Sequence, residues 1–329
     1  KQNGRHRKHN CNRSARTQRS IPFSTRRYST IVIPLLITPS TDIKDKTISG
    51  EKKTMSNFWQ RTLAGAVFIV VLVASISFSK FTFGALFLFF TIIGVLEFYK
   101  LSKLDNANPL KTYGTIVSGL LFIASFVFAF NEPSLPIKAL ALIIPLCFVV
   151  FVIELYRKPS PRPFTNIAYT ILGIVYVAIP ISTLNFIVTP TFGSSEYHPN
   201  ILLGYFIIVW CNDTGGYLVG RSFGKRKLFE RISPKKSWEG SFGGAALSAI
   251  AAFAVAYFYN DLRILDWIIV ASIIVIVGSL GDLVESLFKR SINVKDSGSF
   301  LPGHGGVLDR FDALLLSAPF VYSYIVLIQ

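Results

Sequence analysis

Long apolar segments recur along the chain from residue 62 to its end. Each is at least 18 residues long, and there are nine of them, at 62–79, 81–98, 113–130, 136–155, 167–189, 201–219, 241–259, 264–281 and 311–328. A helix crosses a bilayer in about 20 apolar residues, so every segment is long enough to span one. The chain is 51% hydrophobic and only 16% charged, whereas soluble domains are about a quarter charged. The sequence predicts an all-α polytopic integral membrane protein with about nine spans.

The basic residues alternate between the two sides of these predicted spans. The N-terminal side and the even-numbered loops carry 18 Lys and Arg near the span ends, and the odd-numbered loops carry 3. Basic loops stay in the cytoplasm, so this pattern predicts a cytoplasmic N-terminus and an outside C-terminus. Glu97 and Glu154 then lie near cytoplasmic span ends, where we expect their side chains to reach water.

Residues 1–54 differ from the rest of the chain. They hold 13 Lys and Arg against 3 Asp and Glu, and the single methionine of the chain is Met55. We expect 1–54 to be a basic disordered segment from translation upstream of the native start; an organellar transit peptide is the alternative. Because the positive charge is concentrated there, no nucleic-acid partner is expected. The remainder divides into 55–200, with five spans, and 201–329, a catalytic region with four.

Polar residues gather in the last third of the chain. Asp213 lies well inside the sixth apolar segment, where a carboxylate is costly and is a functional candidate by default. The motif Gly216-x-x-x-Gly220 would let another helix approach closely. The loop that follows is rich in Lys and Arg and contains SPKKSWEG. Lysines and backbone N–H groups at a helix start favour phosphate binding, so a defined turn with a phosphate cradle is predicted before the seventh span.

The last cytoplasmic loop combines acids, bases and glycines. Asp282, Glu285 and Ser286 have helical spacing, so they share one helix face, and Lys289 follows one turn later. Asp309 and Asp312 are spaced the same way at the start of the ninth span. Carboxylates beside lysines are the groups that a Mg²⁺-bound phosphate needs. The three separate cysteines offer no zinc spacing.

The residues from 286 to 312 resemble a known family. Ser286-Leu-Phe-Lys-Arg290, Lys295-Asp-Ser-Gly298 and Leu301-Pro-Gly-His-Gly-Gly-Val-Leu-Asp-Arg-Phe-Asp312 match the signature of the phosphatidate cytidylyltransferases, and the resemblance extends over 55–329. It implies transfer of CMP from CTP to phosphatidic acid, giving CDP-diacylglycerol and pyrophosphate in phospholipid biosynthesis. It also implies Mg²⁺, a second cation such as K⁺, a homodimer, and a bacterial inner membrane with the active site facing the cytoplasm.

The resemblance also implies roles for individual residues. Catalysis is expected from Asp282, Asp309, Lys289 and Asp213, and metal binding from Asp282, Asp309, Asp213 and Asp312. The phosphates of CTP and phosphatidate are expected to contact Lys235, Lys236, Ser237, Ser286, Arg290, Lys295, His304 and Arg310. His304 either donates to a phosphate or fixes the loop.

Three alternatives remain open at this point. One is the same chemistry on another lipid, such as an ether lipid or a polyprenyl phosphate. Another is a transporter with Asp213 on an ion path; the polar set is confined to the last third and no internal repeat is visible, which argues against it. The third is a non-catalytic membrane scaffold.

Overall fold

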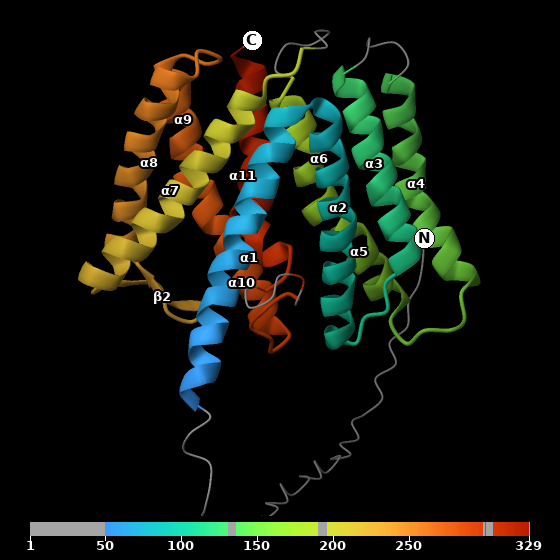
Figure 1. Cartoon of the computed structure of the whole chain (residues 1–329). Coiled ribbons are helices and arrows are strands. Elements are labelled where there is room, and N and C mark those ends of the chain that lie inside the picture. The colour runs from blue at the N-terminus through green and yellow to red at the C-terminus, as the bar shows by residue number, and fades with distance from the viewer. Residues whose placement is uncertain (1–49, 131–135, 190–195, 299, 301–304, 329) are drawn as a thin grey trace, which may run out of the picture. The chain divides into compact units, whose positions relative to one another are not determined.

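The computed structural model describes residues 50–130, 136–189, 196–298, 300 and 305–328, all within one compact unit, Ser49–Gln329. Helices make up most of these residues (Figure 1). The α-helices are α1 (Gly50–Phe78), α2 (Lys80–Ser102), α3 (Lys111–Phe130), α4 (Pro136–Tyr156), α5 (Pro163–Gly173), α6 (Ile179–Ile187), α7 (Pro199–Phe223), α8 (Trp238–Phe258), α9 (Ile264–Ile273), α10 (Ser279–Ser291) and α11 (Leu308–Leu327). A 3₁₀ turn, η1 (Lys103–Asp105), follows α2.

Every one of the nine predicted segments coincides with helix. Among the described residues, seven helices are long and apolar enough to cross a membrane. They are Lys80–Asp105, Lys111–Phe130, Pro163–Ile187, Pro199–Phe223, Trp238–Phe258, Ile264–Ser291 and Leu308–Leu327. The described apolar parts of α1 and α4 are shorter, Thr62–Phe78 and Ile144–Tyr156. An all-α membrane protein is therefore confirmed.

Two of the seven long helices pass through a π-helical turn. The turn η2 (Ile174–Ala178) joins α5 to α6, and η3 (Ile274–Gly278) joins α9 to α10. π-Turns in helices occur often at functional sites. The second one lies directly before α10, so the helix that starts at Ile264 continues about ten residues past the predicted span end and carries the acidic face with it.

Helix α11 connects the two parts of the described chain. It packs against α6 and α2 from the first five spans and against α9, η3 and α10 from the last four. An aromatic cluster fixes its first turns: the ring centroid of Phe311 lies 5.1 Å from that of Phe90 on α2 and 6.5 Å from that of Phe206 on α7. Phe311 stands between Arg310 and Asp312, so this packing also sets the position of the signature.

A small β-hairpin interrupts the helices before α8, where the sequence predicted only a turn. Strand β1 (Lys227–Phe229) pairs antiparallel with β2 (Ser233–Ser237). Ile232 is buried beneath the hairpin. The Glu239 carboxylate accepts the backbone N–H groups of Lys225 and Arg226, at 3.1–3.2 Å, and so ties the start of the hairpin to α8. The sequence did not predict this hairpin, because the contact that holds it joins Glu239 to residues 13 and 14 positions earlier in the chain.

The prediction that Glu97 and Glu154 reach water is wrong. Their exposed fractions are 9% and 7%. Glu154 accepts hydrogen bonds from Asn166 at 2.6 Å and pairs with Arg157 at 3.1 Å. Glu97 lies against the signature loop, as described below; this loop joins α10 to α11, and its described residues are 292–298, 300 and 305–307. Both carboxylates are held by partners inside the protein, so neither has to extend to solvent.

Candidate active site

A cavity of about 290 Å³ lies among β1, β2 and the helices α7, α8, η3, α10 and α11. Its lining brings together residues far apart in the sequence. The polar side chains that face it are Asn212, Asp213, Lys235, Lys236, Ser237, Ser241, Ser279 and Asp282. Five of the predicted site residues therefore surround one cavity.

Close packing of α7 on α8 forms one wall of this cavity. A Cβ at Gly215 would lie 2.5 Å from the carbonyl oxygen of Gly243, so only glycine allows this approach. Gly216 and Gly220 also lie against Gly240, within 3.7 Å by the same measure. The predicted close approach at the Gly216-x-x-x-Gly220 motif is confirmed, and α8 is the partner helix.

The start of α8 brings hydroxyl and backbone N–H groups to the cavity. Ser237 is buried and is the N-cap residue of α8, where its Oγ accepts the N–H of Gly240 at 3.1 Å. Its hydroxyl proton remains available to a ligand. The positive end of the helix dipole lies beside Lys235 and Lys236, an arrangement that favours an anion.

Lys236 and Asp282 face each other across the cavity. The Lys236 Nζ lies 2.6 Å from Oδ2 of Asp282, and both side chains are about a third exposed. Ser286, one turn further along α10, donates to Oδ1 of Asp282 at 3.3 Å. The helical face predicted from the spacing of Asp282 and Ser286 is therefore present.

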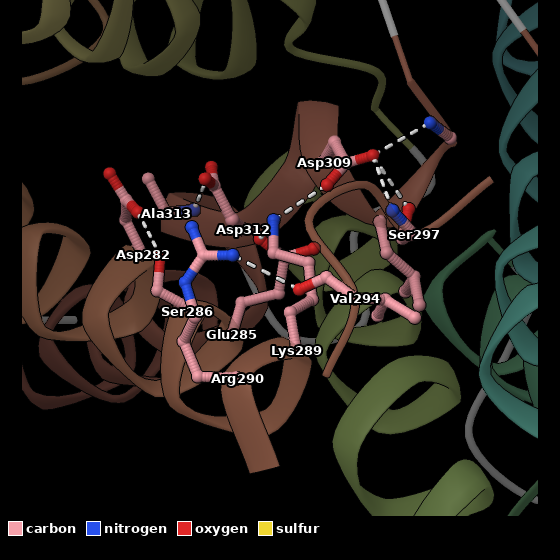
Figure 2. Close-up of polar contacts among 12 residues, drawn as sticks. Asp282, Glu285, Ser286, Lys289, Arg290, Val294, Ser297, Asp309, Asp312 and Ala313 are labelled. Atoms are coloured by element: carbon pink, nitrogen blue, oxygen red, sulfur yellow. Dashed lines mark hydrogen bonds and ion pairs between the residues drawn. The ribbon is translucent and has the colours of Figure 1, made fainter. Parts of the chain in front are cut away.

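A second polar cluster lies beside the cavity and is drawn in Figure 2. Lys289 Nζ lies 2.8 Å from Glu285 Oε2 and 2.6 Å from Asp309 Oδ1. Asp309 Oδ2 accepts three further hydrogen bonds, from the N–H and hydroxyl of Ser297 at 2.8 and 2.9 Å and from the N–H of Gly306 at 2.8 Å. Asp309 thus joins α10, the signature loop and α11.

Gly305 allows the loop to fold back on Asp309. Its φ of +83° lies in the left-handed region, which glycine adopts without strain. A Cβ at this position would also contact the Asp309 carboxylate. Gly305 of the signature is therefore required by this turn.

Four of the other predicted site residues, Asp312, Arg290, Lys295 and Arg310, lie in the described part of the chain. Asp312 Oδ1 accepts the N–H of Ala313 at 2.7 Å, and its charge interacts with those of Asp282 and Asp213. Arg290 is exposed and donates to the carbonyl of Val294 at 3.1 Å. Lys295 and Arg310 are also exposed. His304 lies outside the described residues.

The oxygen atoms of the site carboxylates suit a divalent cation. Among the described residues, no three His, Cys, Asp or Glu side chains are grouped closely enough to hold a metal ion as they stand. Asp213 and Asp282 nevertheless line the same cavity and repel each other. Carboxylate oxygens are the preferred ligands of Mg²⁺. Asp309 is not among the described residues that line the cavity, and its role as a metal ligand stays a prediction.

Sequence reasoning missed Tyr176 and the loop contact of Glu97, and it placed Glu285 on the acidic helix face without assigning it to the site. Glu285 is buried and Tyr176 is partly buried near Asp282 and Asp312, and each has one buried oxygen without a hydrogen-bond partner among the described residues. Tyr176 lies in the π-turn η2, which apolar periodicity cannot distinguish from ordinary helix. Only the acidic spacing on α10 pointed to Glu285.

Comparison with known proteins gives one consistent result. Residues 59–328 match the profile of the Cytidylyltransferase family. A phosphatidate cytidylyltransferase of Staphylococcus aureus is 36% identical over 68% of this chain and 85% of its own length, and that of Rickettsia bellii is 34% identical over 64% and 89%. That of Haemophilus influenzae is 49% identical over 39% of this chain and 46% of its own length. The chain therefore belongs to the cytidylyltransferase family.

Proposed function

We propose that this chain is a phosphatidate cytidylyltransferase, which transfers CMP from CTP to phosphatidic acid and releases pyrophosphate. The observation that carries the proposal is the single cavity shared by Asp213, Asp282, Lys235 and Lys236 at the start of α8. Cations and helix N–H groups there suit a polyphosphate, and carboxylates suit its metal. The names of the relatives reported above supply the substrate class.

The reaction needs positioning more than a reactive side chain. A phosphate oxygen of the lipid attacks the α-phosphorus of CTP, a P–O bond forms, and the bond to pyrophosphate breaks. The lipid phosphate is itself an adequate nucleophile, so no covalent intermediate on the protein is needed. Lys235 and Lys236 hold phosphate oxygens in this scheme, and Ser237 donates its free hydroxyl proton to one of them.

Asp213 and Asp282 are the proposed ligands for Mg²⁺, because both face the cavity. When bound, the cation neutralises phosphate charge as the leaving group departs. Asp309 and Asp312 stay candidate ligands from the resemblance, together with a second cation such as K⁺. In this scheme Lys236 would exchange its contact with Asp282 for a phosphate oxygen of the substrate.

The membrane placement of the site follows from charge. We propose nine spans, including α1 and α4, with the N-terminus and the hairpin in the cytoplasm, where CTP is found. The bacterial relatives favour the inner membrane as the location. The lipid headgroup then meets the nucleotide at the cytoplasmic surface. A homodimer is the assembly that the resemblance implies.

The test is incorporation of labelled CTP into lipid by the purified full chain in vesicles containing phosphatidic acid. We expect CDP-diacylglycerol to form with Mg²⁺, to stop with EDTA, and to return when Mg²⁺ is restored. We expect Asp282→Asn to lower kcat by about a hundredfold or more, the scale of losing a positioned electrostatic group.

Asp105→Asn is the matched control, because Asp105 lies in η1, does not line the cavity, and accepts a hydrogen bond from the Tyr169 hydroxyl at 2.7 Å. It should keep wild-type activity. Product from an ether-linked or polyprenyl phosphate, but not from phosphatidic acid, would reassign the substrate. Full activity of Asp282→Asn would refute the proposed site.

A further inference from the structure

Glu97 of α2 lies under the signature loop, although 211 residues separate it from Leu308. Its Oε2 accepts the N–H of Leu308 at 3.2 Å, and the N–H of Val307 adds a second hydrogen bond. The Ser297 hydroxyl is within hydrogen-bonding reach of both Glu97 and Asp309, and its one proton serves one of them at a time. A side chain from the first five spans therefore contacts the signature at three points.

The two glycines of the loop that border Glu97 leave no space for a side chain. A Cβ at Gly298 would lie 2.6 Å from Glu97 Oε1 and 2.9 Å from its carboxylate carbon. A Cβ at Gly306 would meet the same carboxylate and the Ser297 hydroxyl. The loop backbone thus rests directly on Glu97, and the absence of side chains at these positions is what permits the contact.

The Glu97 carboxylate is held by backbone and hydroxyl dipoles, and it forms no ion pair with a cation among the described residues. Within the described residues, its hydrogen bonds come from backbone N–H groups at the start of α11 and from Ser297. A buried carboxylate is costly unless it is hydrogen-bonded, and the N-terminal end of a helix favours negative charge. The position of α11 and the charge on Glu97 therefore stabilise each other.

The contact continues from Glu97 to the predicted catalytic residues. Gly306 and Ser297, which touch Glu97, also donate to Asp309, and Asp309 holds Lys289 (Figure 2). The neighbour of Glu97, Phe98, stacks on Phe288 of α10 with ring centroids 5.2 Å apart. Helix α2 thus supports α10 and the loop together.

We propose that Glu97 is a positioning residue for this reaction: its charge fixes the loop and the start of α11, and through them Asp309 and Lys289. The inference rests on the proposed function of the α7–α8–α10 cavity and its neighbouring signature. A displacement of about 1 Å in such a network can lower a rate by roughly a hundredfold.

The first variant is Glu97→Gln, which keeps the size of the side chain and removes its charge. We expect kcat to fall about tenfold or more while the KM for CTP stays within about twofold, because the variant shifts the reacting groups and leaves the cavity lysines in place. The control is Glu154→Gln, an equally buried glutamate that contacts α4 and α5 and not the loop. It should keep the wild-type kcat. Equal kcat values for the two variants would overturn the inference.

A second measurement separates positioning from general packing. Gly298→Ala should lower kcat in the wild type, because its Cβ meets the Glu97 carboxylate. In a Glu97→Ala background that obstacle is gone, so the same change should cost little more. If the two effects on kcat simply multiply, the residues are not coupled and the inference fails. If Glu97→Ala does not fold, the comparison of Glu97→Gln with Glu154→Gln decides.

Asp282→Asn in the same assay distinguishes failure of the positioning role of Glu97 from failure of the proposed active site. An inactive Asp282→Asn beside a fully active Glu97→Gln would overturn the positioning role alone. An active Asp282→Asn would overturn the proposed site, and the positioning role with it.

Discussion

The ion pair between Lys236 and Asp282 joins two side chains that both face the cavity. Each is about a third exposed, and such pairs are worth about 0–1 kcal/mol because water screens them. Lys236 can therefore leave the Asp282 carboxylate and bind an incoming phosphate at little cost in free energy. The Lys289–Asp309 pair is different, because its side chains are only 11% and 10% exposed, and removing one partner from a buried pair costs about 3–5 kcal/mol. At the residue scale, one pair is suited to binding and the other to holding the loop.

Replacing Lys236 should weaken CTP binding. A hydrogen bond to a charged group is worth about 1.5–3 kcal/mol, and each 1.4 kcal/mol is about tenfold in affinity. We expect Lys236→Met to raise the KM for CTP by roughly ten- to a hundredfold. Steady-state kinetics with labelled CTP measures it. Lys225→Met, an exposed lysine outside the cavity lining, is the control and should change KM by less than about twofold.

Helix α7 and helix α8 depend on glycine for their contact, and the cavity depends on that contact. Gly215 and Gly243 bring the two backbones together, and Asp213 lies one turn or less away on the same helix. A methyl group added at Gly215 would meet the backbone of Gly243. Backbone moves aside less easily than the end of a flexible side chain. At the element scale, the packing of these helices and the shape of the site are one feature.

Gly215→Ala should therefore lower both stability and activity. Overpacking a tight contact costs about 1–3 kcal/mol, and the wall of the cavity shifts with it. The matched control is Gly119→Ala on α3, a buried helical glycine whose Cβ would meet its nearest atom only at 4.0 Å. There, alanine should be neutral or stabilise by up to about 1 kcal/mol. Thermal unfolding in detergent, followed by circular dichroism, compares the two. A lower midpoint for Gly119→Ala than for Gly215→Ala would contradict this account.

The distribution of charge predicts how the whole molecule lies in the membrane. The hairpin before α8 holds several Lys and Arg, whereas Asn260, between α8 and α9, has few basic residues near it. By the positive-inside rule we expect these two loops on opposite sides of the membrane. The proposed placement of the cavity on the cytoplasmic side rests on the same rule.

Single-cysteine labelling tests this orientation. In a chain whose cysteines at positions 11, 147 and 211 are changed to serine, Phe229→Cys and Asn260→Cys add one exposed thiol each. In intact cells an impermeant maleimide should label Asn260→Cys and leave Phe229→Cys unlabelled until the membrane is opened. The reverse pattern would invert the topology.

The positions of the helices could be predicted from the sequence because apolar length is a local property. Residues within one helix could also be related, since Asp282 and Ser286 share a face in any helix of that spacing. The signature from 286 to 312 indicated the family, which the profile match over residues 59–328 confirms. These conclusions need only neighbours along the chain.

The tertiary structure alone decided which distant groups meet. The loop contact of Glu97, the position of the buried Tyr176 hydroxyl near Glu285, and the pairing of Lys236 with Asp282 each involve separate elements. The sequence predicted that the Glu97 side chain reaches water, because a glutamate near the end of a span can usually extend to the solvent. The fold instead places two side-chain-free glycines and the N–H groups of α11 against that carboxylate. Whether a side chain is buried, and which groups it bonds to, depends on the elements that pack against it. The spacing of residues along one helix does not contain that information.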